Sequence, residues 1–181
     1  MQYTVLGKTG LRVSKVAFGA LPIQRISTEE AVRILRKAYE NGINFFDTAR
    51  AYTDSEEKVG KALSDVRKNI VIATKTHAAD AKTMREHLET SLEKLKTDYI
   101  DIYQFHNPKN IRSEKFMEML EEAKKAKKEG RIRFISITNH TADIAKEAIA
   151  TGYYDTLQYP FSSISSQGDY EITLMCKEQN M

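Results

Sequence analysis

Four side chains of different chemistry stand at or just after the ends of three short apolar runs. Asp47 and Lys75 lie at the ends of two such runs, His106 directly follows a third, and Tyr52 lies in the segment after Asp47. A carboxylate, an ammonium, an imidazole and a phenol are groups that enzymes use to bind and move protons. Burying an ionisable group at the end of an apolar strand is costly unless the group is paired. The pattern therefore predicts a proton-transfer site.

Each of these residues also has an ordinary structural explanation when it is considered alone. Asp47 would pair or cap locally, and Lys75 would extend into solvent. Tyr52 would pack, and His106 would be a hydrogen-bonded interior histidine. Four such coincidences at one edge of a sheet are much less expected than any single one. A Lys75 ammonium about 4 Å from Tyr52, at an effective dielectric near 20, would favour the phenolate by roughly 4 kcal/mol, or about three pKa units. Asp47 would keep Lys75 charged.

Six β-like runs alternate with longer amphipathic segments along the chain. They cover residues 13–19, 44–48, 70–75, 99–105, 132–138 and 156–161. Their starts are about 30 residues apart, the length of a strand, a crossover helix and two loops. This alternation predicts a parallel sheet covered by helices, in which the carboxyl ends of the strands share one edge. Asp47, Lys75 and His106 would occupy equivalent positions at that edge.

The segments around these strands carry start and stop signals of their own. Two pairs have the spacing of a helix capping box, namely Ser27 with Glu30 and Asp54 with Glu57. Near the amino terminus, residues 3–6 and 11–13 flank a glycine-bearing turn and predict a β-hairpin. No linker, composition shift or charge block divides the chain, so we expect one domain over residues 1–181.

The composition excludes several classes of protein. Of the 181 residues, 41 % are hydrophobic and 29 % are charged, as in an ordinary globular protein. The net charge of +3 is small and dispersed, so no nucleic-acid partner is expected. No apolar run approaches the roughly 20 residues of a membrane helix, so no membrane partner is expected either. The single cysteine, Cys176, and the lack of a secretory signal suit a cytoplasmic protein.

Two α/β architectures fit the alternation, an open doubly wound sheet and a closed β/α barrel. The first strand ends in FGALP (18–22) and lacks the G-x-G-x-x-G turn of a dinucleotide-binding sheet. Four further segments decide the matter by similarity: LGKTGLRVS (6–14), GINFFDTA (42–49), LKTDYID (95–101) and ISITNH (135–140). With these segments, nearly the whole chain resembles the aldo-keto reductases.

The resemblance implies a TIM-type (β/α)8 barrel and NAD(P)H-dependent reduction of a small aldehyde or ketone, with NADP(H) favoured over NAD(H). It implies that Tyr52 is the general acid, that Lys75 and Asp47 tune it, and that His106 orients the carbonyl. Tyr52 and His106 would thus contact the substrate. The implied cofactor contacts are Ala20, Asp47, Thr138, Asn139 and Gln158. Thr138 stands where the family usually has serine and keeps the hydroxyl.

Two further histidines near the same edge suggest no metal site. His77 and His140 have no metal-ligand spacing, and loop or packing roles are expected for both. His87 lies in the middle of a helical segment and is expected to face solvent.

The chain supplies only about six of the eight β/α units that a barrel needs, and eight would take roughly 230 residues at this spacing. We therefore expect a truncated barrel with open sheet edges, and for this chain alone weak NADPH binding, self-association, or both. Two other functions remain open at this point. One is a Schiff-base lyase or aldolase that uses Lys75, and the other is a non-catalytic, cofactor-binding regulatory subunit.

Overall fold

The computed structural model describes residues 1–181 and contains a six-stranded parallel sheet and a two-stranded antiparallel hairpin. The sheet strands lie side by side in chain order: β3 (Phe18–Gly19), β4 (Phe45–Asp47), β5 (Val71–Thr76), β6 (Ile100–His106), β7 (Ile132–Thr138) and β8 (Thr156–Gln158). The hairpin consists of β1 (Tyr3–Val5) and β2 (Arg12–Ser14). The helices are α1 (Thr28–Glu40), α2 (Ser55–Leu63), α3 (Ala81–Leu95), α4 (Glu114–Lys128), α5 (Ala142–Thr151) and α6 (Gln167–Glu178).

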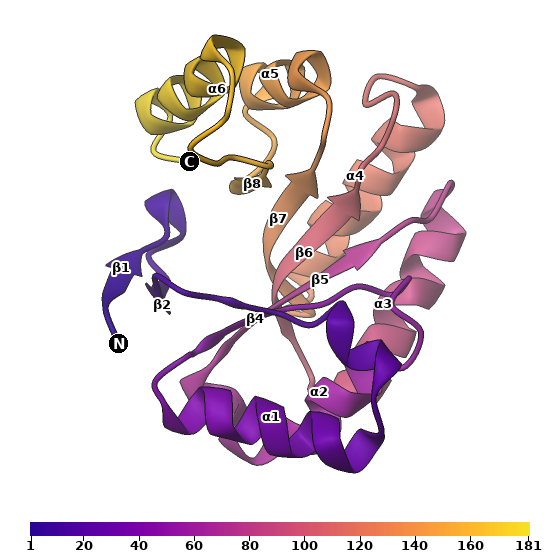
Figure 1. Cartoon of the computed structure of the whole chain (residues 1–181). Coiled ribbons are helices and arrows are strands. Elements are labelled where there is room, and N and C mark those ends of the chain that lie inside the picture. Colours follow the sequence, from indigo (N-terminus) through magenta and orange to yellow (C-terminus); the bar gives the residue numbers. More distant parts are fainter.

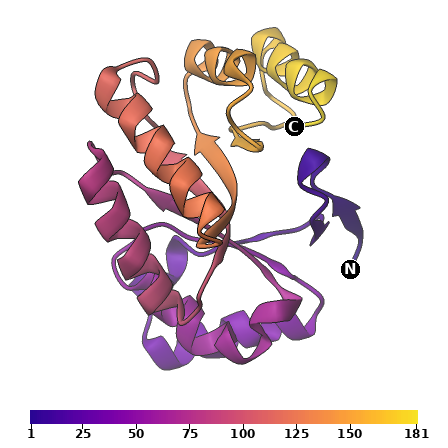
Figure 2. The ribbon, with the colours of Figure 1, turned by 180° about the vertical axis from the view of Figure 1, so that it is seen from behind.

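The α-helices form an arc around one side of the curled sheet (Figure 1). The view from behind shows the same arc, with the amino-terminal hairpin on the side of the sheet away from α3 and α4 (Figure 2). Parallel strands in chain order, each followed by a helix on the outside, are the arrangement of a β/α barrel. The predicted fold class is confirmed: six β/α units of such a barrel are present, together with the hairpin.

Successive residues of each strand face opposite sides of the sheet, and this alternation separates the core into two parts. On β5, Ile72 packs in the main core with the helices, whereas Val71 and Ala73 pack against Leu11 and Val13 of the hairpin region. We call the side of the sheet that faces the hairpin the inner face. The inner face is therefore apolar near the amino ends of the strands, and any functional group on it must come later along each strand.

Two of the predicted strands differ from the observed ones. The run 13–19 does not form one strand, because Arg12–Ser14 pairs with β1 and only Phe18–Gly19 joins the parallel sheet. The hydroxyl of Ser14 donates to the carbonyl of Val16 at 2.8 Å and turns the chain between the two. The run 156–161 ends early, at Gln158, because Pro160 has no N–H to continue the ladder.

Of the two predicted capping boxes, one is present in part and the other is absent. Ser27 accepts a hydrogen bond from the N–H of Glu30 at 3.2 Å and caps α1. Asp54 precedes α2 but makes no capping bond, so the prediction of a capping box there is wrong. Its carboxylate instead lies 2.8 Å from the amine of the buried Lys58. Asp54 pairs with this amine rather than with the backbone of the helix, because a buried ammonium must be paired.

Helices α2 and α3 approach each other closely at Gly60. A Cβ atom at this position would lie 2.2 Å from the carbonyl oxygen of Lys94 and 2.7 Å from the carbonyl carbon of Leu95. Only glycine allows this approach, which brings α2 and the loop before it against the sheet. None of the helices is both long and apolar enough to cross a membrane.

Candidate active site

The inner-face residues at the carboxyl ends of the strands form a staggered row. The ladder pairs Asp47 with Ala73, Lys75 with Gln104, and His106 with Thr138. Lys75 therefore lies two residues beyond Ala73, which is the partner of Asp47. His106 in turn lies two residues beyond Gln104, which is the partner of Lys75. The prediction that Asp47, Lys75 and His106 occupy equivalent positions is wrong in this respect. The stagger is the shear that a parallel sheet needs when it curls toward a barrel.

Lys75 and Asp47 form a buried ion pair at this edge. The Nζ atom of Lys75 donates to Oδ2 of Asp47 at 2.5 Å and to the backbone carbonyl of Thr48 at 2.8 Å. The side chain of Lys75 is only 3 % exposed and that of Asp47 is 17 % exposed. Burial lowers the pKa of Lys75, and the nearby Asp47 carboxylate opposes that change. The pairing of an ammonium with a carboxylate, predicted from the sequence, is present.

Tyr52 lies in the loop between β4 and α2, and its ring contacts both Lys75 and His106. The Nζ atom of Lys75 is 5.2 Å from the centroid of the Tyr52 ring, and the His106 ring meets it edge to face at 5.9 Å. Burial and the Asp47 carboxylate raise the pKa of Tyr52 above its usual value. From the sequence, the Lys75 ammonium was expected to lower the pKa of Tyr52, and that expectation is wrong here. Lys75 directs its hydrogen bonds to Asp47 and Thr48, so its charge is largely balanced.

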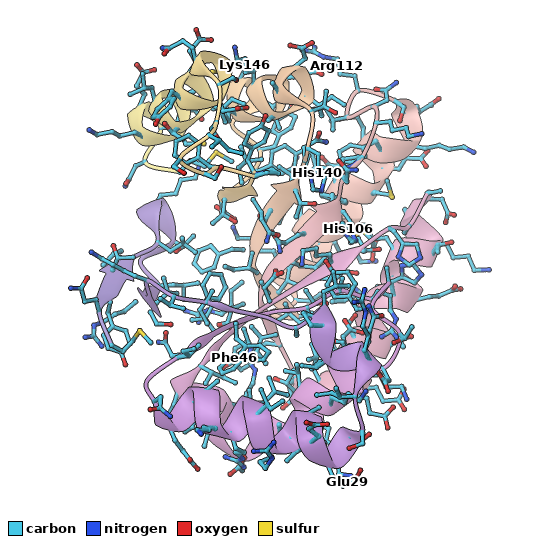
Figure 3. The ribbon with its side chains drawn as sticks, viewed as in Figure 1. Glu29, Phe46, His106, Arg112, His140 and Lys146 are labelled. Atoms are coloured by element: carbon cyan, nitrogen blue, oxygen red, sulfur yellow. The ribbon has the colours of Figure 1, made fainter.

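His106 ends β6 and shares a cavity with the other two groups. Its pKa is lowered by burial and by the nearby Lys75 and His77, so the neutral imidazole is favoured at neutral pH. Figure 3 shows His106 close to His140 at the same edge of the sheet. A cavity of about 220 Å³ opens at this edge, lined by Tyr52, Lys75, His106, Thr138, His140, Gln158, Tyr159 and Pro160. The structure therefore brings all four predicted catalytic residues together, with three of them lining this cavity.

The five predicted cofactor contacts fall into two groups. Asp47, Thr138 and Gln158 lie on the inner face, and two of them line the cavity. Gln158 accepts a hydrogen bond from the amide of Gln104 at 3.3 Å, which leaves its own amide nitrogen free to donate. Ala20 and Asn139 are buried.

These two buried residues are held by neighbouring segments, Ala20 by the start of α2 and Asn139 by loop residues. Ala20 has a fully buried side chain, and its carbonyl accepts a hydrogen bond from the hydroxyl of Ser55 at 2.8 Å. The amide of Asn139 donates to the carbonyl of Pro108 at 2.9 Å and accepts from the N–H of Thr141 at 2.8 Å.

Gln104 belongs to this site, although it was not predicted from the sequence. It is buried on β6, and its amide donates to Oδ1 of Asp47 at 3.0 Å as well as to Gln158. Its own oxygen accepts the hydroxyl of Ser136 at 3.2 Å. The sequence could have indicated Gln104, because it stands two residues before His106. The two side chains therefore face the same side of the strand.

The remaining histidines lie beside the site without forming a metal centre. His87 was expected to face solvent, but its Nδ1 atom lies 2.9 Å from the hydroxyl of Thr76, and its ring is 4.7 Å from that of His77. The prediction that His87 faces solvent is wrong, because the face of α3 that carries His87 packs against the end of β5. No group of three or more histidine, cysteine, aspartate or glutamate side chains is placed to hold a metal ion.

Comparison with known proteins gives a consistent result. A family model described as "Aldo/keto reductase family" matches residues 15–181. The L-galactose dehydrogenase of Arabidopsis thaliana is 36 % identical over 160 residues, which cover 80 % of this chain and 50 % of the plant protein. A probable voltage-gated potassium channel subunit beta, also from Arabidopsis thaliana, is 36 % identical over 124 residues, covering 60 % of this chain and 38 % of that protein.

A solved structure extends the similarity to the whole chain. The holo form of an aldo-keto reductase from Bacillus halodurans superimposes with a TM-score of 0.91 at 29 % identity, covering 100 % of this chain and 64 % of that one. The chain thus spans half the length of the plant dehydrogenase and less than two thirds of the Bacillus halodurans protein.

Proposed function

Because the chain belongs to the aldo/keto reductase family, we propose that it carries the active site of an enzyme that reduces an aldehyde or ketone with NADPH. The observation that carries this proposal is the convergence of Tyr52, Lys75 and His106 on one cavity, with Asp47 paired to the lysine. The use of a nicotinamide cofactor is supported by the donor groups of Thr138 and Gln158 beside that cavity, which suit a carboxamide. The choice of NADPH over NADH rests on the family resemblance.

In this mechanism the bound nicotinamide supplies the hydride, and the chain supplies the proton. Tyr52 holds its proton firmly, because burial and Asp47 raise its pKa, and it donates that proton to the carbonyl oxygen as charge develops there. Neutral His106 can donate one N–H to the same oxygen and orient the substrate. The Lys75 ammonium, kept charged by Asp47, is then the cation beside the phenolate that remains on Tyr52 after the transfer.

The experiment that tests this function compares Tyr52→Phe with the unaltered protein. NADPH oxidation is followed with a panel of small aldehydes and ketones, and NADPH binding is followed by fluorescence. We expect Tyr52→Phe to abolish turnover and leave NADPH binding nearly unchanged, because only the proton donor is lost. Tyr153→Phe serves as a matched control, since Tyr153 is exposed beside Lys124, well outside the cavity lining. Loss of turnover together with loss of NADPH binding would contradict the role given to Tyr52.

Two other functions give different outcomes in the same assays. A Schiff-base enzyme needs a neutral amine, and the 2.5 Å contact with Asp47 works against that state of Lys75. Borohydride trapping of a carbonyl compound on Lys75, read by mass spectrometry, would support it. The potassium channel subunit among the relatives is the observation in favour of a regulatory subunit. NADPH binding by the unaltered protein without any turnover would support that function.

Three further expectations belong to the same proposal. We expect residues 1–181 to behave as one domain and the protein to act in the cytoplasm, which the single free cysteine Cys176 supports. We also expect copies of the chain to associate, because β3 and β8 are open edge strands. Light scattering after size exclusion measures that association directly.

A further inference from the structure

Asn107, the residue after His106, ties the loop after β6 to the end of β7. Its backbone N–H donates to the carbonyl of Thr138 at 3.0 Å and lies 3.1 Å from the hydroxyl oxygen of the same residue. Its side-chain oxygen accepts the N–H of His140 at 3.2 Å. One asparagine therefore holds both the last residue of β7 and the second residue of the loop that follows it.

The loop after β7 also contains an asparagine, Asn139, whose side chain bonds to the loop after β6. The amide of Asn139 donates to the carbonyl of Pro108, and its oxygen accepts the N–H of Thr141. Each loop thus bonds to the other through an asparagine side chain, and Asn139 is almost fully buried between them. The two loops form one unit, which we call the asparagine clamp (Asn107 and Asn139).

The clamp joins the two histidines that line the cavity. His106 directly precedes Asn107, and the backbone of His140 is the group that the Asn107 side chain holds. We infer that Asn107 is a positioning residue, which sets the placement of the His106 and His140 rings relative to Tyr52. This inference rests on the proposed carbonyl-reductase function.

The backbone conformation explains why asparagine stands at this position. Asn107 has a φ of 53°, in the left-handed region that asparagine and glycine adopt more readily than other residues. Glycine would keep this conformation but would lose the oxygen that holds His140. The substitution Asn107→Gly therefore removes the clamp's side-chain bond while leaving the loop free to keep its path.

The chain offers a matched control for that substitution. Asn180 is also left-handed, with a φ of 51°, and its hydrogen bond to the turn of the hairpin uses its backbone carbonyl, which accepts the N–H of Lys8. Asn180→Gly makes the same chemical change at a residue that does not line the cavity. Any effect of replacing a left-handed asparagine as such is common to both variants.

The test measures turnover and the environment of each imidazole in the full protein. We expect Asn107→Gly to lower kcat by about tenfold to a hundredfold with little change in the KM for NADPH, because small misplacements of positioned groups have effects of this size. In nitrogen-detected NMR spectra of the imidazoles at constant pH, the signals of His106 and His140 should shift. The His87 signal, anchored by Thr76, should stay in place, and Asn180→Gly should match the unaltered protein.

Each remaining outcome overturns the inference. Unchanged kcat in Asn107→Gly shows that the clamp does not position catalytic groups, even if the imidazole signals move. Unmoved His106 and His140 signals show that Asn107 does not place these rings. If the unaltered protein reduces no carbonyl compound, the proposed function fails, whereas the NMR comparison still decides whether Asn107 holds the two rings.

Discussion

The Nζ atom of Lys75 lies over the face of the Tyr52 ring, 5.2 Å from its centroid. The ammonium is shared with Asp47, which accepts its 2.5 Å hydrogen bond, so the phenol sees a nearly balanced ion pair. In the proposed mechanism, Tyr52 keeps its proton until a carbonyl oxygen beside it develops negative charge. The Lys75 ammonium would then lie beside the phenolate as it forms, which is when such an interaction accelerates a reaction.

The pKa directions at Tyr52 and His106 predict the pH profile of carbonyl reduction. Tyr52 must be protonated to act as an acid, and its pKa is raised above 10.0 by burial and Asp47, so activity should fall only above about pH 10. His106 must be neutral, and its pKa is lowered below 6.5, so activity should be lost only as the pH falls below that value. The plot of log kcat/KM against pH should therefore be flat across neutrality.

His106→Gln provides the check on this assignment. An amide cannot take up a proton in this range, so the variant should lose the acidic limb of the profile and keep the alkaline one. A fall in kcat/KM centred near pH 7 to 8 in the unaltered protein would contradict both assignments, because neither group should titrate there.

The Asp47–Lys75 pair should show strong coupling in stability as well. Asp47→Asn leaves the ammonium of Lys75 buried without its charged partner, and breaking such a pair typically costs about 3–5 kcal/mol. Lys75→Met alone leaves the Asp47 carboxylate without its positively charged partner and should also lower the free energy of unfolding. The double variant removes both charges, so its loss of unfolding free energy should be smaller than the sum of the two single losses. Urea denaturation of the three variants measures this coupling, and strictly additive losses would show that the two charges do not depend on each other.

Much of the fold was predictable because it depends on local patterns. The period of about 30 residues and the apolar strands at 70–75 and 132–138 reproduce β5 and β7 closely. The convergence of Asp47, Lys75 and His106 was predictable because strand ends share an edge in any parallel sheet. What the pattern could not supply is the offset between neighbouring strands, which places Asp47 opposite Ala73 rather than opposite Lys75, and Lys75 opposite Gln104 rather than opposite His106.

The errors arise where tertiary contacts decide the outcome. Asp54 has the spacing of a helix cap, yet it pairs with Lys58, which is buried only in the folded chain. His87 lies at a helical position compatible with exposure, yet the fold brings Thr76 within hydrogen-bond distance. The raised pKa of Tyr52 has the same origin, since the burial of its side chain and the nearby Asp47 carboxylate both arise only in the folded chain.

Gln104 offers a prediction that connects the buried polar network with cofactor binding. Gln104→Met keeps the side-chain volume nearly constant but removes the donor shared by Asp47 and Gln158. The loss of a hydrogen bond to a buried charged group should lower the free energy of unfolding by about 1–3 kcal/mol. Because Gln158 is no longer held, NADPH should bind several-fold more weakly, about tenfold for each 1.4 kcal/mol lost at that contact.

Fluorescence titration with NADPH and urea denaturation measure the two effects of Gln104→Met separately. Gln179→Met is the matched control, because Gln179 is exposed after the end of α6 and neither change is expected there. A lower stability with unchanged NADPH affinity would mean that Gln104 supports only Asp47. Unchanged stability would mean that the hydrogen bond to Asp47 adds nothing to the fold. The expected result, a loss of both, follows from the position of Gln104 between the ion pair and the cavity, where one amide group serves a carboxylate on β4 and a carboxamide on β8.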